Sequence, residues 1–169
     1  MNLLDEEVFV VMLAIIVVAS ILSIAQILKS EIVEPFSAIG LLGENCKIGD
    51  YPDKVFNGEN ITLCIFLDNH MGYPVYFQVR YKIGSNETLP TNTTPSPQPT
   101  IMVFEALLDN KANKTFKISI PVNVSEELLG SRVALIFELW MYDIDSNEWV
   151  YTGRWNHLYV RVLEVPLGG

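Results

Sequence analysis

The segment DIDSNE at residues 143–148 places oxygen ligands at alternate positions. Asp143, Asp145 and Asn147 occupy positions one, three and five of a calcium-binding loop. The rest of that loop does not fit, because position six is Glu148 where glycine is required and position twelve is Arg154, which would repel the ion. We therefore interpret the segment as a polar turn between two strands, with a calcium site as the alternative, and we expect no cofactor.

Two histidines and two cysteines are the other candidates for catalysis or metal binding. His70 lies in the segment DNHMG and His157 in RWNHLYV, and neither has a nucleophile motif around it. The histidines and cysteines also lack the short ligand spacings of zinc sites. We therefore expect that the protein is not an enzyme.

Cys46 and Cys64 are an even pair, which in a protein outside the cytoplasm suggests a disulfide. In a strand, Cys64 points away from the face that carries Leu63 and Ile65. A disulfide would therefore require Cys46 to fold back over this outer face. A disulfide and two buried free thiols both fit the sequence.

Aromatic residues cluster near the carboxyl end of the chain. The cluster consists of Trp140, Tyr142, Trp149, Tyr151, Trp155 and Tyr159. In a hairpin, Trp140 and Tyr142 would share one face with Tyr151 nearby, and cross-strand aromatic pairs stabilise sheets without a ligand. Flat exposed rings could instead bind sugars. We favour packing or a protein interface, where Trp and Tyr are enriched.

Five sequons predict N-glycosylation. Their asparagines are Asn60, Asn86, Asn92, Asn113 and Asn123. About one sequon is expected by chance at this composition. The enrichment predicts covalent glycans and places this part of the chain on the glycosylating side of a membrane.

Two of these sequons lie in the Pro/Thr-rich segment 84–100. Its four prolines exclude a helix and a central strand, and Leu89 is its only large apolar residue. We expect a solvated loop that joins two strands at one end of the domain.

The composition excludes one class of partner, nucleic acid, and indicates another, lipid. A net charge of -9 with only 11 lysines and arginines excludes nucleic acid, which requires clustered cations. The hydrophobic content of 50% and the mean hydropathy of +0.28 indicate a segment that faces lipid.

Residues 8–28 form an uncharged apolar run of 21 residues, long enough as a helix to span about 30 Å of hydrocarbon. The alternative is a cleaved signal peptide, for which Ser23 and Ala25 have suitable spacing, but no Lys or Arg precedes the run. We predict a single-pass anchor in the cell membrane, with the carboxy-terminal domain outside the cell.

After residue 36 the apolar pattern changes to a period of two, which is typical of half-buried strands. The candidate strands are residues 36–42, 61–69, 75–83, 101–108, 115–122, 132–142 and 157–165. Gly72 and Pro74 predict that the second and third form a hairpin or lie side by side. These seven strands predict an all-β immunoglobulin-like sandwich over residues 36–169, after an anchor at 1–30 and a linker at 31–35.

Residues 41–79, LLGENCKIGDYPDKVFNGENITLCIFLDNHMGYPVYFQV, carry a family resemblance. Their Leu-Gly, Gly-Asp-Tyr-Pro, Gly-Glu-Asn and Asn-His-x-Gly spacing, with the later FELWMYD and RWNHLYVRV, resembles the exported domain of an uncharacterised archaeal membrane-protein family, domain of unknown function 1616. Members often carry several helices before this domain, whereas this chain has one. The resemblance covers about residues 36–165 and implies archaeal origin, membrane attachment and an outward-facing sandwich, without implying any chemistry.

Three functions fit these observations. The first is a non-catalytic, membrane-anchored interaction module, as an accessory subunit of a membrane complex or a component of the cell envelope. Its partners would be membrane lipid, other membrane or envelope proteins, or further copies of itself. The alternatives are a pilin-like filament subunit, with the apolar helix in the filament core, and a glycan-binding envelope domain.

Overall fold

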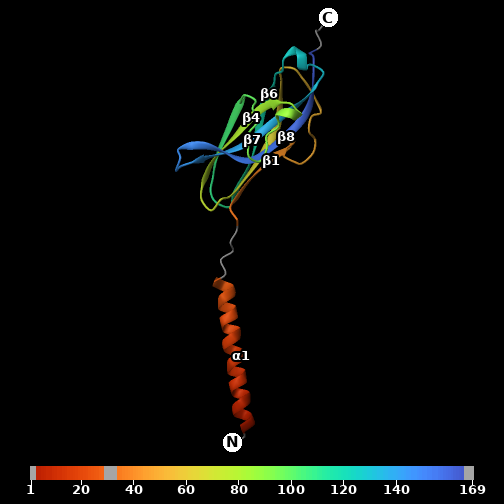
Figure 1. Cartoon of the computed structure of the whole chain (residues 1–169). Helices are drawn as coiled ribbons and strands as arrows, with labels where there is room; N and C mark the ends of the chain where they lie inside the picture. Colours follow the sequence, from red (N-terminus) through yellow and green to blue (C-terminus); the bar gives the residue numbers. More distant parts are fainter. Residues whose placement is uncertain (1–2, 29–33, 166–169) are drawn as a thin grey trace. The chain divides into compact units, whose positions relative to one another are not determined.

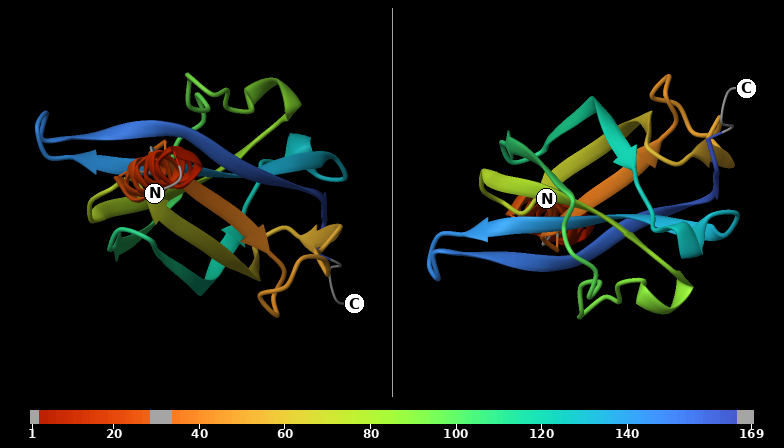
Figure 2. Two further views of the ribbon diagram at one scale, coloured as in Figure 1. Left: turned by 90° about the horizontal axis from the view of Figure 1, so that it is seen from below. Right: turned by 90° about the horizontal axis from the view of Figure 1, so that it is seen from above.

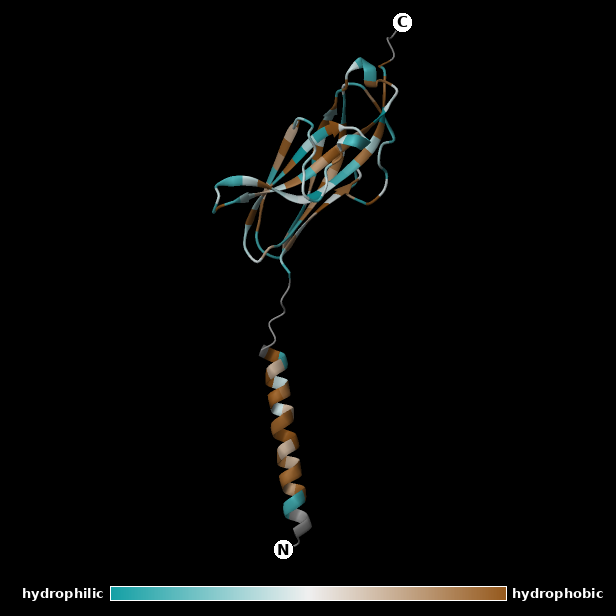
Figure 3. Ribbon diagram, in the orientation of Figure 1, coloured by the Kyte–Doolittle hydropathy of each residue, from teal (hydrophilic) through white to brown (hydrophobic). Residues whose placement is uncertain are grey.

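The computed structural model describes residues 3–28 and 34–165, which divide into an amino-terminal helix and a β domain. The predicted boundaries that fall on residues 1–2, 29–33 and 166–169 lie outside the described residues. Helix α1 runs from Leu3 to Leu28. Its Glu6–Ile27 segment is apolar and long enough to cross a membrane, a test that a signal sequence also passes, and Figure 3 shows this apolar character along the helix.

The two hydroxyl groups in the middle of α1 are satisfied inside the helix. Ser20 Oγ donates to the carbonyl oxygen of Ile16 at 2.7 Å, and Ser23 Oγ donates to that of Ala19 at 2.8 Å. Such back-bonding to the preceding turn leaves these two side chains compatible with an apolar environment.

The β domain contains two sheets (Figures 1 and 2). The first is antiparallel, in the order β1-β3-β6, and its strands are β1 (Phe36–Leu42), β3 (Glu59–His70) and β6 (Ala112–Val122). The second has the order β2-β8-β7-β4-β5, with β2 (Lys54–Phe56), β8 (Glu148–Leu163), β7 (Arg132–Asp143), β4 (Val75–Gly84) and β5 (Met102–Leu108). Strand β2 runs parallel to β8, and the other neighbours are antiparallel. Short 3-10 turns occupy Asn86–Thr88 and Glu126–Leu128.

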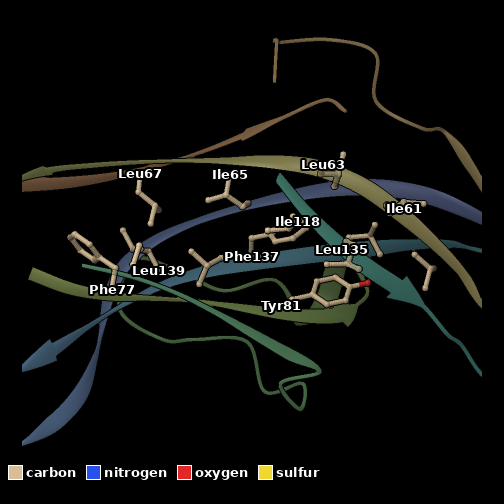
Figure 4. Packing of buried hydrophobic residues seen from close by; sticks show 14 of the residues in the cluster. Ile61, Leu63, Ile65, Leu67, Phe77, Tyr81, Ile118, Leu135, Phe137 and Leu139 are labelled. Carbon is tan, nitrogen blue, oxygen red and sulfur yellow. The ribbon is translucent and has the colours of Figure 1, made fainter. Parts of the chain in front are cut away.

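One hydrophobic core lies between the two sheets (Figure 4). Leu63 and Ile65 point into it from β3, and Phe77, Phe137 and Leu139 point into it from the five-stranded sheet. The period of two therefore has the predicted physical cause, because alternate residues of each strand face the opposite sheet. Burial of each such side chain contributes roughly 1.5–3 kcal/mol to folding.

The predicted mostly-β class with one apolar helix is confirmed, and every predicted strand matches an observed one. The count of seven is wrong by one, because β2 has only three residues and so offers no period to detect. Strand β8 is also longer than the predicted 157–165, since it begins at Glu148 and directly follows the turn after β7.

The prediction that β3 and β4 form a hairpin or lie side by side is wrong, because these strands belong to different sheets. The chain crosses from one sheet to the other at residues 71–74. The buried side chain of Asn69 fixes this crossing, since its Nδ2 donates to the carbonyl oxygens of Tyr73 and Leu108, each at 2.9 Å. A buried amide with several backbone partners is not visible in a pattern of apolar residues.

The Pro/Thr-rich loop 84–100 joins β4 to β5, but it is not a fully solvated loop at one end of the domain. It lies against the outer face of the five-stranded sheet, on the far side of the blue strands from the yellow and orange strands in Figure 2. Pro90 and Ser96 are buried there, and Thr91 accepts a hydrogen bond of 2.9 Å from the Tyr151 hydroxyl. The loop packs through backbone groups and prolines, which explains why its lack of large apolar residues did not predict this contact.

Candidate functional site

The aromatic cluster lies on the outer face of the five-stranded sheet, not in the core between the sheets. In the register of β7 and β8, Trp140 is opposite Tyr151 and Tyr142 is opposite Trp149, while Trp155 is opposite Glu138. The ring centres of Trp140 and Tyr151 are 5.5 Å apart, as expected from the sequence. The Tyr142 and Trp149 rings meet edge to face at 5.3 Å.

Two residues of β4 extend this cluster, and the sequence alone did not identify them. Tyr76 packs against Trp149 with ring centres 5.3 Å apart, and the Arg80 guanidinium lies 3.8 Å from the centre of the Trp140 ring. Burial removes part of the solvation of Arg80 and lowers its pKa, a cost that the nearby Glu138 carboxylate partly offsets.

The inner part of this face is closed by the loop and a buried carboxylate. Glu138 Oε2 accepts a hydrogen bond of 3.1 Å from the Trp140 indole, and Glu138 Oε1 accepts one of 2.5 Å from the Ser96 backbone amide. Burial, followed by the Glu138 charge, raises the pKa of Tyr151 to about 12. This half of the face is therefore packed and structural.

The outer part of the same face is open and forms a groove of about 660 Å³ at one end of the sheet. Its lining is mostly apolar and aromatic, with two carboxylates. The lining residues are Tyr73, Pro74, Tyr76, Leu107, Met141, Tyr142, Asp143, Ile144 and Asp145. Such a groove suits apolar side chains of a partner, and its carboxylates favour a cation beside them.

The turn after β7 is the predicted polar turn of a hairpin. The Asp143 carboxylate accepts hydrogen bonds from Ser146 Oγ at 2.8 Å and from the Asp145 amide at 3.1 Å, and these bonds hold the pKa of Asp143 below its usual value. Asn147 has a φ of 56° and accepts a bond of 2.5 Å from the Tyr142 hydroxyl. The side-chain oxygens of Asp143 and Asn147 are thus engaged within the turn. Over residues 3–28 and 34–165, no three His, Cys, Asp or Glu side chains are grouped to hold a metal.

The two histidines each lie beside aromatic rings. His70 stacks on Phe36 with ring centres 4.6 Å apart, and its Nε2 is 3.3 Å from an Asp68 carboxylate oxygen. His157 lies between Trp155 and Tyr159, at 5.4 and 4.7 Å between ring centres. Both side chains make packing contacts with neighbouring rings.

Cys46 and Cys64 form a disulfide, with their Cα atoms 5.1 Å apart. Cys64 lies on the outer face of β3, and Cys46 reaches it with a φ of 57°. The segment 43–50 therefore folds back over the three-stranded sheet, as a disulfide was expected to require.

All five sequon asparagines are exposed. Asn60 lies in β3 and Asn113 in β6, Asn123 follows β6, and Asn86 and Asn92 lie in the loop over the five-stranded sheet. A glycosylating enzyme needs exposed asparagine, so these positions are compatible with the predicted modification.

The sequence matches no known protein family, and no curated protein is detectably similar to it. The resemblance to the uncharacterised archaeal family therefore stays a prediction.

Among the solved structures similar to this chain, three examples have low sequence identity and TM-scores below 0.5. The CARDB domain of the PF1109 protein from Pyrococcus furiosus, crystallised with di-metal ions, is 13% identical with a TM-score of 0.48, over 78% of this chain and 96% of that one. A β-glucosidase from Listeria innocua in complex with glucose is 7% identical with a TM-score of 0.45, over 77% of this chain and 16% of the enzyme. The sporulation control protein Spo0M from Bacillus subtilis is 11% identical with a TM-score of 0.45, over 77% of this chain and 50% of that one.

Proposed function

We propose that this protein is a non-catalytic interaction module, anchored in a membrane by α1, with an N-glycosylated, immunoglobulin-like β domain outside the cell. In this role it is an accessory subunit of a membrane complex or a component of the cell envelope. The observation that carries the proposal is the Glu6–Ile27 segment, which is apolar on all sides and has no side chain buried by protein. A helix of this kind needs lipid to cover it.

Two further features support an exported domain. The disulfide between Cys46 and Cys64 is typical of oxidising compartments, and the five sequon asparagines are exposed. The open groove beside Tyr76 supplies a surface for a partner.

A labelling experiment tests the proposal. The full chain with a carboxy-terminal tag is produced in intact glycosylating cells, which are treated with a membrane-impermeant amine reagent before alkaline extraction. Exposed lysines such as Lys54, Lys114 and Lys117 should be labelled, and the labelled chain should stay in the membrane fraction. Glycopeptide mapping in the same sample should find occupied sequons.

The control variant replaces Ile16 and Val17 with arginine. Each arginine near the centre of a span costs about 2.5–3.5 kcal/mol, so the variant should be lost from the membrane fraction. A mature chain that begins beyond Ala25 would show that α1 is a cleaved signal peptide. Unlabelled lysines in the wild type would show that the domain is not outside.

A second candidate function is glycan binding by the open part of the aromatic cluster. Tyr76, Tyr142 and Trp149 remain partly exposed there. Their rings contact one another at tilted or edge-to-face angles, so they do not form one flat platform for a sugar ring. Titration with envelope polysaccharides, followed by tryptophan fluorescence in the wild type and in Trp149→Ala, tests this candidate, and an unchanged wild-type signal would exclude it.

A further inference from the structure

The edges of the two sheets differ in how they are protected against pairing with another strand. An edge strand presents unpaired amide and carbonyl groups, and proteins usually block such edges with lysine, proline, bulges or covering groups. Strand β6, at one edge of the three-stranded sheet, carries the exposed Lys114 and Lys117 together with the sequon at Asn113. This edge is blocked by charge.

Strand β1, at the opposite edge, is blocked by side chains. The carbonyl oxygen of Ile39 accepts a hydrogen bond of 2.7 Å from Asn156 Nδ2, and that of Leu41 accepts one of 2.7 Å from the Tyr51 hydroxyl. These bonds occupy acceptors that a further strand would need.

At the β2 edge of the five-stranded sheet, the protection is geometric. Strand β2 has only three residues and begins with Lys54. The part of β8 that β2 does not pair with is irregular, because Gly153 has a φ of 73° next to a shift in the register with β7. The charged residue Arg154 comes directly after this glycine. A strand interrupted in this way is a poor template for pairing.

Strand β5, at the other edge of this sheet, has none of these devices. Met102–Leu108 contains no Lys, Arg, Pro or Gly, and no described strand pairs with its free side. Its outer face shows two apolar side chains to solvent, since Val103 is 43% exposed and Leu107 is 67% exposed. Leu107 also lines the open groove, so the bare edge and the groove are continuous.

The single charge on β5 is held in place. Glu105 accepts hydrogen bonds from the Tyr76 hydroxyl and, at 2.7 Å, from Gln78 Nε2. These two bonds lower the pKa of Glu105, so its carboxylate stays charged. Asp143 and Asp145 add negative charge at the groove, and no Lys or Arg is among the residues that line it.

The negative charge of Glu105 decides which kind of strand can pair with the free edge of β5. A second copy paired antiparallel about Glu105 would place two carboxylates directly opposite each other, which is unfavourable. A strand with a cation at this position gains an opposite-charge pair, and apolar residues two positions away on either side would lie beside Val103 and Leu107.

We propose that β5 binds an extended segment of another protein by strand addition, with a Lys or Arg opposite Glu105 and apolar side chains beside Val103 and Leu107. Backbone hydrogen bonds to the free edge supply affinity, and the Glu105 charge with the adjoining groove supplies selectivity. This inference rests on the proposed function as an interaction module, for which it names the surface and the chemistry of the partner.

The test uses the full chain in detergent and a labelled synthetic peptide, Ser-Thr-Val-Thr-Lys-Thr-Ile-Thr-Ser, whose central lysine can pair with Glu105. A second peptide has glutamate in place of the lysine. We expect the lysine peptide to bind about fivefold more tightly in fluorescence anisotropy, the effect of about 1 kcal/mol from a cross-strand charge pair. Peptide binding should also slow hydrogen exchange of the β5 amides.

Three variants make the test specific. Glu105→Lys should reverse the preference for the two peptides, and Glu105→Gln should abolish it. The matched control Glu127→Lys makes the same charge change at an exposed turn outside β5 and should leave the preference unchanged.

Equal binding of the two peptides, no binding, or a preference that survives Glu105→Lys would overturn the proposal. Protection of the β5 amides that grows with protein concentration without peptide would overturn it too, because the occupant would then be a second copy. These results do not depend on whether α1 is retained in a membrane, so failure here is distinguishable from failure of the labelling experiment.

Discussion

Lys82 Nζ lies 3.0 Å from Glu138 Oε2 on the outer face of the five-stranded sheet, with the two side chains only 6% and 0% exposed. The Pro/Thr-rich loop covers them, and Ser96 connects the loop to both. The Ser96 carbonyl oxygen accepts a bond of 2.8 Å from Lys82 Nζ, while its amide donates to Glu138. The loop is thus attached to this buried ion pair through the backbone of Ser96.

Removal of either charge should be strongly destabilising. Lys82→Met leaves the Glu138 carboxylate buried without its cation, and Glu138→Leu leaves the Lys82 ammonium without its anion. Breaking a buried pair in this way costs about 3–5 kcal/mol in the free energy of unfolding. Urea denaturation of each variant measures the loss.

The double variant Lys82→Met/Glu138→Leu is the informative control for this prediction. With both charges removed, no unpaired charge is buried, and the stability should recover much of the loss. Losses that simply add in the double variant would show that the two groups are not coupled.

The same loop should be released by a methyl group at Gly153. Its φ is 73°, and an added Cβ would lie 2.2 Å from the carbonyl oxygen of Asn92 in the loop. Gly153→Ala should therefore destabilise the domain and open residues 91–100 to limited proteolysis.

Gly72→Ala is the matched control for that variant. Gly72 has a φ of 91° but open space around its Cα, so the substitution carries only the backbone cost of about 1–2 kcal/mol. Equal stability losses and equal cleavage patterns in the two variants would contradict the role given to the Gly153 contact.

The sequence predicted what depends on local pattern. The period of two located the strands, because residues such as Leu63 and Ile65 must alternate with residues on the opposite face whatever their partner strand is. The same alternation placed Trp140 and Tyr151 together and put Cys64 on an outer face. The apolar run of α1 was visible because span length is a property of composition.

The sequence did not predict what depends on contacts distant along the chain. At the crossing between β3 and β4, Asn69 bonds to Leu108, which is 39 residues away. The attachment of the loop rests on Ser96 and Glu138, 42 residues apart. The groove combines Tyr76 and Leu107 with the turn after β7, and no single segment signals this juxtaposition.

The disulfide should contribute about 3 kcal/mol to stability, the value expected for a bridge between cysteines 18 residues apart. Reduction with dithiothreitol should lower the urea midpoint of the wild type by a corresponding amount. The double variant Cys46→Ala/Cys64→Ala should start at this lower stability and show no further response to reductant. A reduced wild type as stable as the oxidised one would contradict the prediction.

His157 should titrate below the usual histidine value, and its titration should make stability depend on pH. Burial between Trp155 and Tyr159, together with the charge of Arg132, lowers the pKa of His157 below 6.5. The unfolded chain therefore binds a proton more readily, so this contribution to stability is complete above about pH 6.5 and falls as the pH drops toward the folded-state pKa. NMR titration of the imidazole protons measures the shift, and Arg132→Gln should raise the pKa partly back because it removes the like charge. A wild-type pKa at or above 6.5 would show that neither the burial nor the Arg132 charge acts on this ring as the structure implies.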